Sequence, residues 1–113
     1  MRVIIVIPAR YRSSRFLGKP LVKLLGKPMI IWVAELSTKV VGKENVYIAT
    51  DDSKIQKTVI QMGYNVVMTS ENCLTGTDRL AEVAKKIEAD IYINVQGDEP
   101  LVDPKDIQKV IDL

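Results

Sequence analysis

The opening of the chain, residues 1–21 (MRVIIVIPARYRSSRFLGKPL), constrains the fold more than any other stretch. Residues 3–7 are apolar, mostly β-branched and followed by Pro8, a pattern typical of a strand buried on both faces. Ligands of open α/β sheets bind at the carboxyl ends of the strands, so the loop after this strand is a candidate site. Up to position 19 that loop contains no acid and four cations, Arg10, Arg12, Arg15 and Lys19.

The residue types of this loop suit an anionic ligand. Like charges in a short loop repel one another, and a bound polyanion would offset that repulsion. Ser13, Ser14 and Gly18 add hydroxyls and a glycine between the cations. A solvated basic loop without a ligand is the alternative, and the loop by itself leaves both interpretations open.

The composition limits the class of protein. A chain of 113 residues, 47% hydrophobic and 27% charged, is typical of one small soluble globular domain. The net charge of +2 predicts neither nucleic acid nor a membrane surface as a partner. No apolar run approaches the ~20 residues of a membrane span, and the start does not resemble a signal peptide. The single Cys73 fits a reducing compartment, so we expect a cytoplasmic location; without histidine, a His/Cys zinc site is excluded.

Strand and helix patterns alternate along the rest of the chain. Strands are predicted at residues 45–50, 64–68 and 91–95, and helices at residues 29–40, after residue 53, after residue 75 and from residue 104. This order predicts an α/β fold with a Rossmann-like, doubly wound and mainly parallel sheet, right-handed crossovers and strand order 3-2-1-4. The first and fourth strands are then neighbours, and the topological switch point lies between their loops.

Local signals predict where the helices begin, end and pack. Pro28 should stand at or near the first position of its helix, Asp52 and Ser53 should cap the next one, and Gly63 should follow its last turn. The first helix places its polar positions at Glu35, Ser37, Thr38 and Lys39. The predicted apolar stripes of the next two helices are Ile55, Val59, Ile60 and Met62, and Leu80, Val83, Ala84 and Ile87.

Two further stretches contain candidate site residues. Residues 75–79 (TGTDR) open a helix whose free N–H groups could meet a ligand, or could form an ordinary cap with a solvated Arg79. Residues 96–100 (QGDEP) follow the last strand directly. A carboxylate there is well placed to hold Mg²⁺ against a triphosphate, although the same pattern also suits a surface turn. We expect Asp98 to be the metal ligand.

Three motifs in the same order, IPARYRSSRFLGKPL, TGTDRLAEV and NVQGDEP, resemble those of the cytidylyltransferases that activate 3-deoxy-manno-octulosonate (Kdo), the CMP-Kdo synthetases. The resemblance extends along the whole chain. Phe16 and Leu17 stand where this family usually has Leu-Pro, which loosens the loop, and Arg12 stands where it usually has a small residue. Neither departure removes a residue that the family's motifs assign to chemistry.

The resemblance implies a nucleotidyltransferase of lipopolysaccharide biosynthesis, which uses CTP and a Kdo-like sugar acid to give CMP-Kdo and pyrophosphate with Mg²⁺ as cofactor. By the resemblance, the catalytic residues are Arg15, Lys19 and Asp98. The substrate-binding residues are Pro8, Ala9, Arg10, Ser13, Ser14, Thr77, Arg79 and Gln96. Pro8 and Ala9 bring backbone close to the base, the TGTDR segment lines its cytosine and sugar side, and Gln96 faces the acceptor.

Members of that family are about twice as long as this chain. The resemblance therefore implies that residues 1–113 are the N-terminal nucleotide-binding portion of a single-domain enzyme whose full-length form is a homodimer. We expect the chain alone to bind CTP weakly and not to turn over. A non-catalytic nucleotide- or anion-binding module and a cytidylyltransferase for another ulosonic acid are the alternatives.

Overall fold

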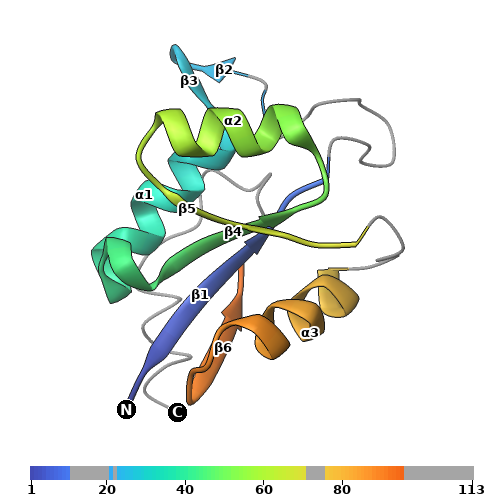
Figure 1. Ribbon diagram of the computed structural model, residues 1–113. Coiled ribbons are helices and arrows are strands. Elements are labelled where there is room, and N and C mark those ends of the chain that lie inside the picture. Colours follow the sequence, from blue (N-terminus) through green and yellow to red (C-terminus); the bar gives the residue numbers. More distant parts are fainter. Residues whose placement is uncertain (11–20, 22, 71–75, 96–113) are drawn as a thin grey trace.

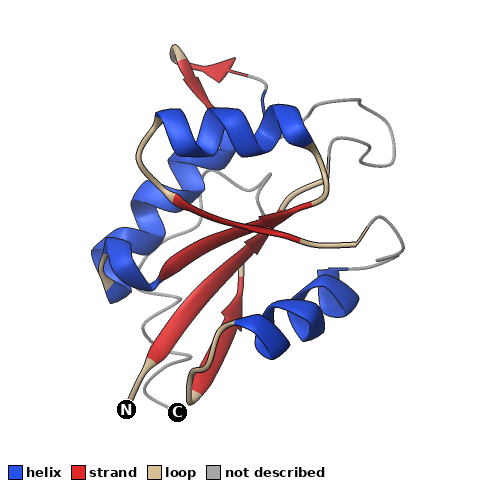
Figure 2. Cartoon of the chain, in the orientation of Figure 1, coloured by secondary structure: helices blue, strands red, loops and turns tan. Residues whose placement is uncertain are grey.

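The computed structural model of the chain describes residues 1–10, 21, 23–70 and 76–95 (Figures 1 and 2). The strands are β1 (Val3–Pro8), β2 (Lys23–Leu24), β3 (Lys27–Pro28), β4 (Val46–Thr50), β5 (Asn65–Met68) and β6 (Ile91–Asn94). The helices are α1 (Met29–Val41), the 3₁₀ turn η2 (Lys43–Asn45), α2 (Ser53–Gln61) and α3 (Gly76–Lys86). The helix predicted from residue 104 lies outside the described residues.

Within these residues, four parallel strands form one sheet in the order β5-β4-β1-β6. This order is the predicted 3-2-1-4, because β5, β4, β1 and β6 are the third, second, first and fourth strand predictions. The central β1 pairs with β4 from Ile5 opposite Val46 and with β6 from Val3 opposite Ile91. The doubly wound, mainly parallel α/β fold is therefore confirmed.

The helices cover both faces of this sheet, and Figure 1 shows α3 on the side away from α1 and α2. Alternate residues of β1 supply the two cores: Ile5 and Ile7 pack with α1 and α2, and Ile4 and Val6 pack with Val83 of α3. All four of these isoleucine and valine side chains are fully buried. A strand that is buried on both faces explains the continuous apolar run at residues 3–7.

A small antiparallel hairpin, β2–β3, precedes α1 and was missed by the sequence analysis. Leu25 and Gly26 form its turn with φ values of 53° and 81°. Consecutive positive φ values are typical of the tight turns that join hairpin strands. Two-residue strands carry no detectable periodicity, which explains why the pattern analysis gave no strand here. Helix α1 then begins at Met29, with Pro28 in the capping position.

Of the predicted caps of α2, Asp52 and Gly63 are confirmed, whereas Ser53 is not a cap. The carboxylate of Asp52 accepts a hydrogen bond from the backbone N–H of Ile55 at 2.9 Å, and Ser53 is the first helical residue. At the other end, Gly63 has a φ of 82°. Its N–H donates to Ile60 and the N–H of Tyr64 donates to Val59, which is the Schellman arrangement. Glycine is favoured here because a left-handed backbone strains most residues with a Cβ.

Some of the predicted helix faces are wrong in detail. Ser37 is fully buried, because its hydroxyl donates to the carbonyl of Val33 at 2.9 Å and so needs no water. Ile60 is 57% exposed and Met62 43% exposed, although both were assigned to the apolar stripe of α2. Ala84 of α3 is exposed as well. The sheet covers only the Ile55–Val59 side of α2, and the sequence does not define how wide the covered stripe is.

The cap of α2 gives a first prediction. Replacing Asp52 by Ala leaves an N–H of the first turn without its acceptor, which should lower the free energy of unfolding by about 1 kcal/mol. Urea unfolding followed by circular dichroism measures this. Ser53→Ala, at the next position, is the matched control and should cost clearly less. Equal losses in the two variants would contradict the assigned cap.

Tyr64, at the end of the α2 turn, gives a prediction on pH. Burial raises the pKa of its phenol, and a hydrogen bond with Thr38 partly opposes that shift. A folded-state pKa above the unfolded value of 10.0 means that the unfolded chain loses this proton first. The stability that this pKa shift contributes is fully present below the unfolded-state pKa and is lost as the pH rises through the folded-state pKa. Tyr64→Phe should therefore lose less stability than the wild type between about pH 9 and 11, measured by urea unfolding.

Candidate functional site

The carboxyl ends of the four strands lie along one edge of the sheet, since all the strands are parallel. Backbone hydrogen bonds continue just past the strand ends: Ala9 N–H donates to Ala49 at 2.9 Å, and Val95 N–H donates to Val6 at 3.0 Å. The chain therefore leaves β1 and β6 at adjacent points. Arg10 and Val95 thus follow neighbouring strands of the sheet, as the switch-point argument predicted.

The first three predicted binding residues differ in exposure. Pro8 and Ala9 are buried, so only their backbone could approach a ligand, as the resemblance implies. Arg10 is the first exposed residue after β1. Its position beyond the last backbone hydrogen bond of the strand lets a guanidinium reach the edge of the sheet.

Most of the other predicted site residues lie outside the described part of the chain. They are Ser13, Ser14, Arg15, Lys19, Gln96 and Asp98. Thr77 lies in the first turn of α3. The structure describes its backbone and not its side chain. Their roles remain predictions from the motifs.

Arg79, in the second motif, is fully buried, and the interpretation as a solvated residue is wrong. One terminal nitrogen, Nη1, donates to the hydroxyl of Thr69, just past β5. The other, Nη2, lies 3.8 Å from a carboxylate oxygen of Asp51, just past β4. Nε and Nη2 have no hydrogen-bond partner. A charge and two unpaired donors thus lie beneath the carboxyl edge of the sheet.

Two more side chains of α3 contact the end of β5, and the sequence analysis did not find them. Glu82 accepts a hydrogen bond from the backbone N–H of Ser70 at 2.8 Å. Lys86 donates to the carbonyl of Met68 at 2.6 Å. The spacing of Arg79, Glu82 and Lys86 places them on one side of the helix, which was the only available signal. These contacts fix α3 against residues 68–70.

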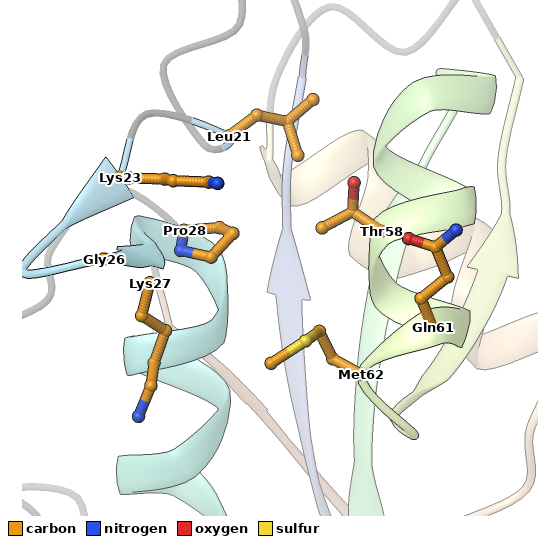
Figure 3. A pocket seen from close by; sticks show the side chains of 8 residues that line it. All are labelled: Leu21, Lys23, Gly26, Lys27, Pro28, Thr58, Gln61 and Met62. Atoms are coloured by element: carbon orange, nitrogen blue, oxygen red, sulfur yellow. The ribbon is translucent and has the colours of Figure 1, made fainter.

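A pocket of about 420 Å³ lies elsewhere, between the β2–β3 hairpin and α2 (Figure 3). Lys23, Lys27 and Pro28 line one wall, and Thr58, Gln61 and Met62 line the other. Of the predicted site residues that the structure describes, namely Pro8, Ala9, Arg10, Thr77 and Arg79, none lines it. The strand ends, and not this pocket, therefore define the candidate site.

Residues 1–10, 21, 23–70 and 76–95 contain neither a cluster of metal ligands nor a membrane-spanning helix. No group of three His, Cys, Asp or Glu side chains among them could hold a metal ion. No helix in these ranges is both long and apolar enough to cross a membrane.

The buried guanidinium gives a prediction on stability. Thr69→Val removes the hydroxyl that Arg79 donates to and leaves another buried charged donor unsatisfied, which should cost about 1–3 kcal/mol. Thr58→Val is the matched control, because that hydroxyl only donates to the carbonyl of Lys54 on an exposed helix surface. Urea unfolding of both variants measures the difference. A loss at Thr69 no greater than at Thr58 would contradict the contact.

Comparison with known proteins shows the family of the chain. The profile of the family described as Cytidylyltransferase matches residues 4–113. A 3-deoxy-manno-octulosonate cytidylyltransferase of Escherichia coli is 49% identical over 97% of this chain and 45% of its own length. An 8-amino-3,8-dideoxy-manno-octulosonate cytidylyltransferase of Shewanella sp. is 51% identical over 100% of this chain and 47% of its own length. The chain thus spans about half the length of these curated relatives.

Solved structures agree with the sequence comparison. A CMP:2-keto-3-deoxy-manno-octonic acid synthetase complexed with CTP superposes with a TM-score of 0.95 and 48% identity, over 99% of this chain and 46% of that one. A cytidylyltransferase from Leptospira borgpetersenii superposes with a TM-score of 0.84 and 28% identity, over 99% of this chain and 48% of that one. The family that the three motifs predicted is confirmed: the chain belongs to the cytidylyltransferases.

Proposed function

We propose that the protein transfers a cytidylyl group from CTP to 3-deoxy-manno-octulosonate, giving CMP-Kdo and pyrophosphate for lipopolysaccharide biosynthesis. The single observation that supports this most is the 48% identity, over 99% of the chain, to a synthetase solved with CTP bound. At that similarity, the carboxyl edge of this sheet corresponds to the same edge of a CTP-binding protein. Because the chain spans about half of its relatives, the activity is proposed for a protein of their length.

The basic loop after β1 would hold the triphosphate. Arg10 is exposed where the chain leaves the sheet, and Arg15 and Lys19 follow in the same loop. One guanidinium group can donate two parallel hydrogen bonds to phosphate oxygens, whereas an ammonium group acts as a point charge. These cations would also stabilise the charge that develops on the leaving pyrophosphate. Ser13 or Ser14 would add a contact to phosphate or ribose.

Asp98 would hold Mg²⁺ beside this loop, because β6, which precedes it, pairs with β1. A carboxylate is the type of donor that Mg²⁺ takes from proteins, together with phosphate oxygens. When bound, the ion would lower the pKa of the attacking hydroxyl and neutralise phosphate charge. Gln96, two residues earlier, would face the acceptor sugar.

An 8-amino sugar acid is a second candidate acceptor, favoured by one specific comparison. The Shewanella relative that is named for 8-amino-3,8-dideoxy-manno-octulosonate is 51% identical, as similar as the relatives named for Kdo. The two acceptors differ at one carbon, where an amine replaces a hydroxyl. Steady-state kinetics of a full-length protein with both acids would decide between them by the ratio of kcat/KM.

The first test is a calorimetric titration of this chain with CTP, with and without Mg²⁺, and with ATP, GTP and UTP as controls. We expect Mg²⁺-dependent binding that prefers CTP. Arg15→Ala should weaken it about tenfold to a hundredfold, as expected for the loss of a charged hydrogen bond. Asp98→Ala should abolish the Mg²⁺ dependence.

Two controls remove similar charges far from the sheet edge. Lys57→Ala removes an exposed cation of α2, and Glu44→Ala removes a carboxylate before the amino end of β4. Neither should change the affinity more than about twofold, by ordinary long-range screening. Equal, metal-independent binding of all four nucleotides would instead indicate the alternative, a non-catalytic anion-binding module.

A further inference from the structure

A pocket of ligand size lies between the β2–β3 hairpin and α2 (Figure 3). Its volume of about 420 Å³ is within the range of about 300–1,000 Å³ that small-molecule pockets in proteins have. Thr58, Gln61 and Met62 form one wall at the carboxyl end of α2, whereas Asp51, which follows β4 at the carboxyl edge of the sheet, precedes the amino end of the same helix. The pocket is therefore separate from the candidate site.

The charge of this pocket favours an anion. The described residues that line it include two lysines and no Asp or Glu. The ammonium of Lys27 is already paired, because it lies 2.6 Å from a carboxylate oxygen of Glu35 and 4.2 Å from the centre of the Trp32 ring. Lys23 is exposed and takes part in none of the ion pairs among the described residues. Lys23 thus brings to the pocket a positive charge that no described carboxylate matches.

The remaining groups of the pocket indicate what else the ligand carries. The hydroxyl of Thr58 donates to a carbonyl of its own helix at 3.0 Å, so its oxygen is left as an acceptor. The amide of Gln61 can donate or accept. Figure 3 shows Lys23 and Thr58 extending towards each other from the two walls, with Pro28 and Met62 beneath them. A cation facing a hydrogen-bond acceptor suits a molecule with an acidic group and a hydroxyl group.

We propose that this pocket binds a small hydroxylated organic anion, either a hydroxy acid or a phosphorylated polyol. The acidic group pairs with Lys23, and a hydroxyl group donates to Thr58. A ligand that contacts both walls joins the hairpin to α2, so its binding raises the melting temperature of the chain. The inference goes beyond the proposed function, because none of the described residues predicted for nucleotide binding lines the pocket.

The test is a calorimetric titration of the chain with D-gluconate and with glycerol 3-phosphate. Sorbitol and glycerol are the uncharged counterparts of these two probes. We expect at least one anion to bind ten times more tightly than its counterpart, as the loss of a charged hydrogen bond would give, and to raise the melting temperature. Binding of gluconate alone identifies a hydroxy acid, and binding of glycerol 3-phosphate alone identifies a phosphorylated polyol. If neither anion binds more tightly than its counterpart, the inference is overturned.

Variants of the two walls show whether the pocket holds the anion. Lys23→Met should weaken binding about tenfold, and Lys23→Arg, which keeps the charge, should restore most of it. Met62 is 43% exposed, so Met62→Trp can fill the pocket without disturbing the core, and it should abolish binding with every charge kept. Lys57→Met is the matched control, since it removes an exposed cation of α2 that does not line the pocket, and it should change the affinity less than about twofold.

Amide chemical shifts in nuclear magnetic resonance spectra locate the bound anion. We expect changes at Lys23, Thr58 and Met62, and none at Ala9 and Val95, which follow β1 and β6. Changes confined to the sheet edge, or equal losses of affinity in Lys23→Met and Lys57→Met, overturn the inference. A chain that binds these anions at Lys23 and does not bind CTP would contradict the proposed function alone.

Discussion

Burial of β1 on both faces is the constraint on which the rest of this structure depends. Ile5 and Ile7 point to one helix layer and Ile4 and Val6 to the other, so the strand can lie only in the centre of the sheet. At about 25 cal/mol for each Å² of apolar surface removed from water, a doubly buried strand is among the largest stabilising contributions that so short a segment can make. The neighbours β4 and β6 then pair with its two sides.

The central position of β1 also determines where charge can gather. Its carboxyl end lies between those of β4 and β6, so the chain leaves β1 at the middle of the sheet edge. A cationic loop that begins there can reach a ligand from the middle of the edge. Arg79 brings a further positive charge to the same edge from below, where it contacts Thr69 and lies near Asp51. The candidate site thus has an exposed cation, Arg10, at the end of β1 and a buried one, Arg79, that contacts the residues after β4 and β5.

The sequence predicted the fold well, because each core element carries a strong periodic or capping signal. The strand bounds differ from the predictions by one residue, and Asp52 and Gly63 cap α2 as expected. The errors lie where the signal is weak. The β2–β3 hairpin is too short to show a period, and the exposure of Ile60 and Met62 depends on how much of α2 the sheet covers.

The sequence by itself determined the family, the strand order and the segments that meet at the carboxyl edge, because motif order and apolar periodicity are local properties of the chain. Only the tertiary structure decided that Arg79 is internal. A helix pattern places Arg79 one turn before Val83, but it does not define whether a sheet, a loop or water lies opposite. Arg79 is buried because the crossover from β5 to β6 packs α3 against the ends of β4 and β5, where Thr69 and Asp51 lie. The contacts of Glu82 and Lys86 with the end of β5 were decided in the same way, since residues 12 to 18 positions apart meet there only after α3 has packed.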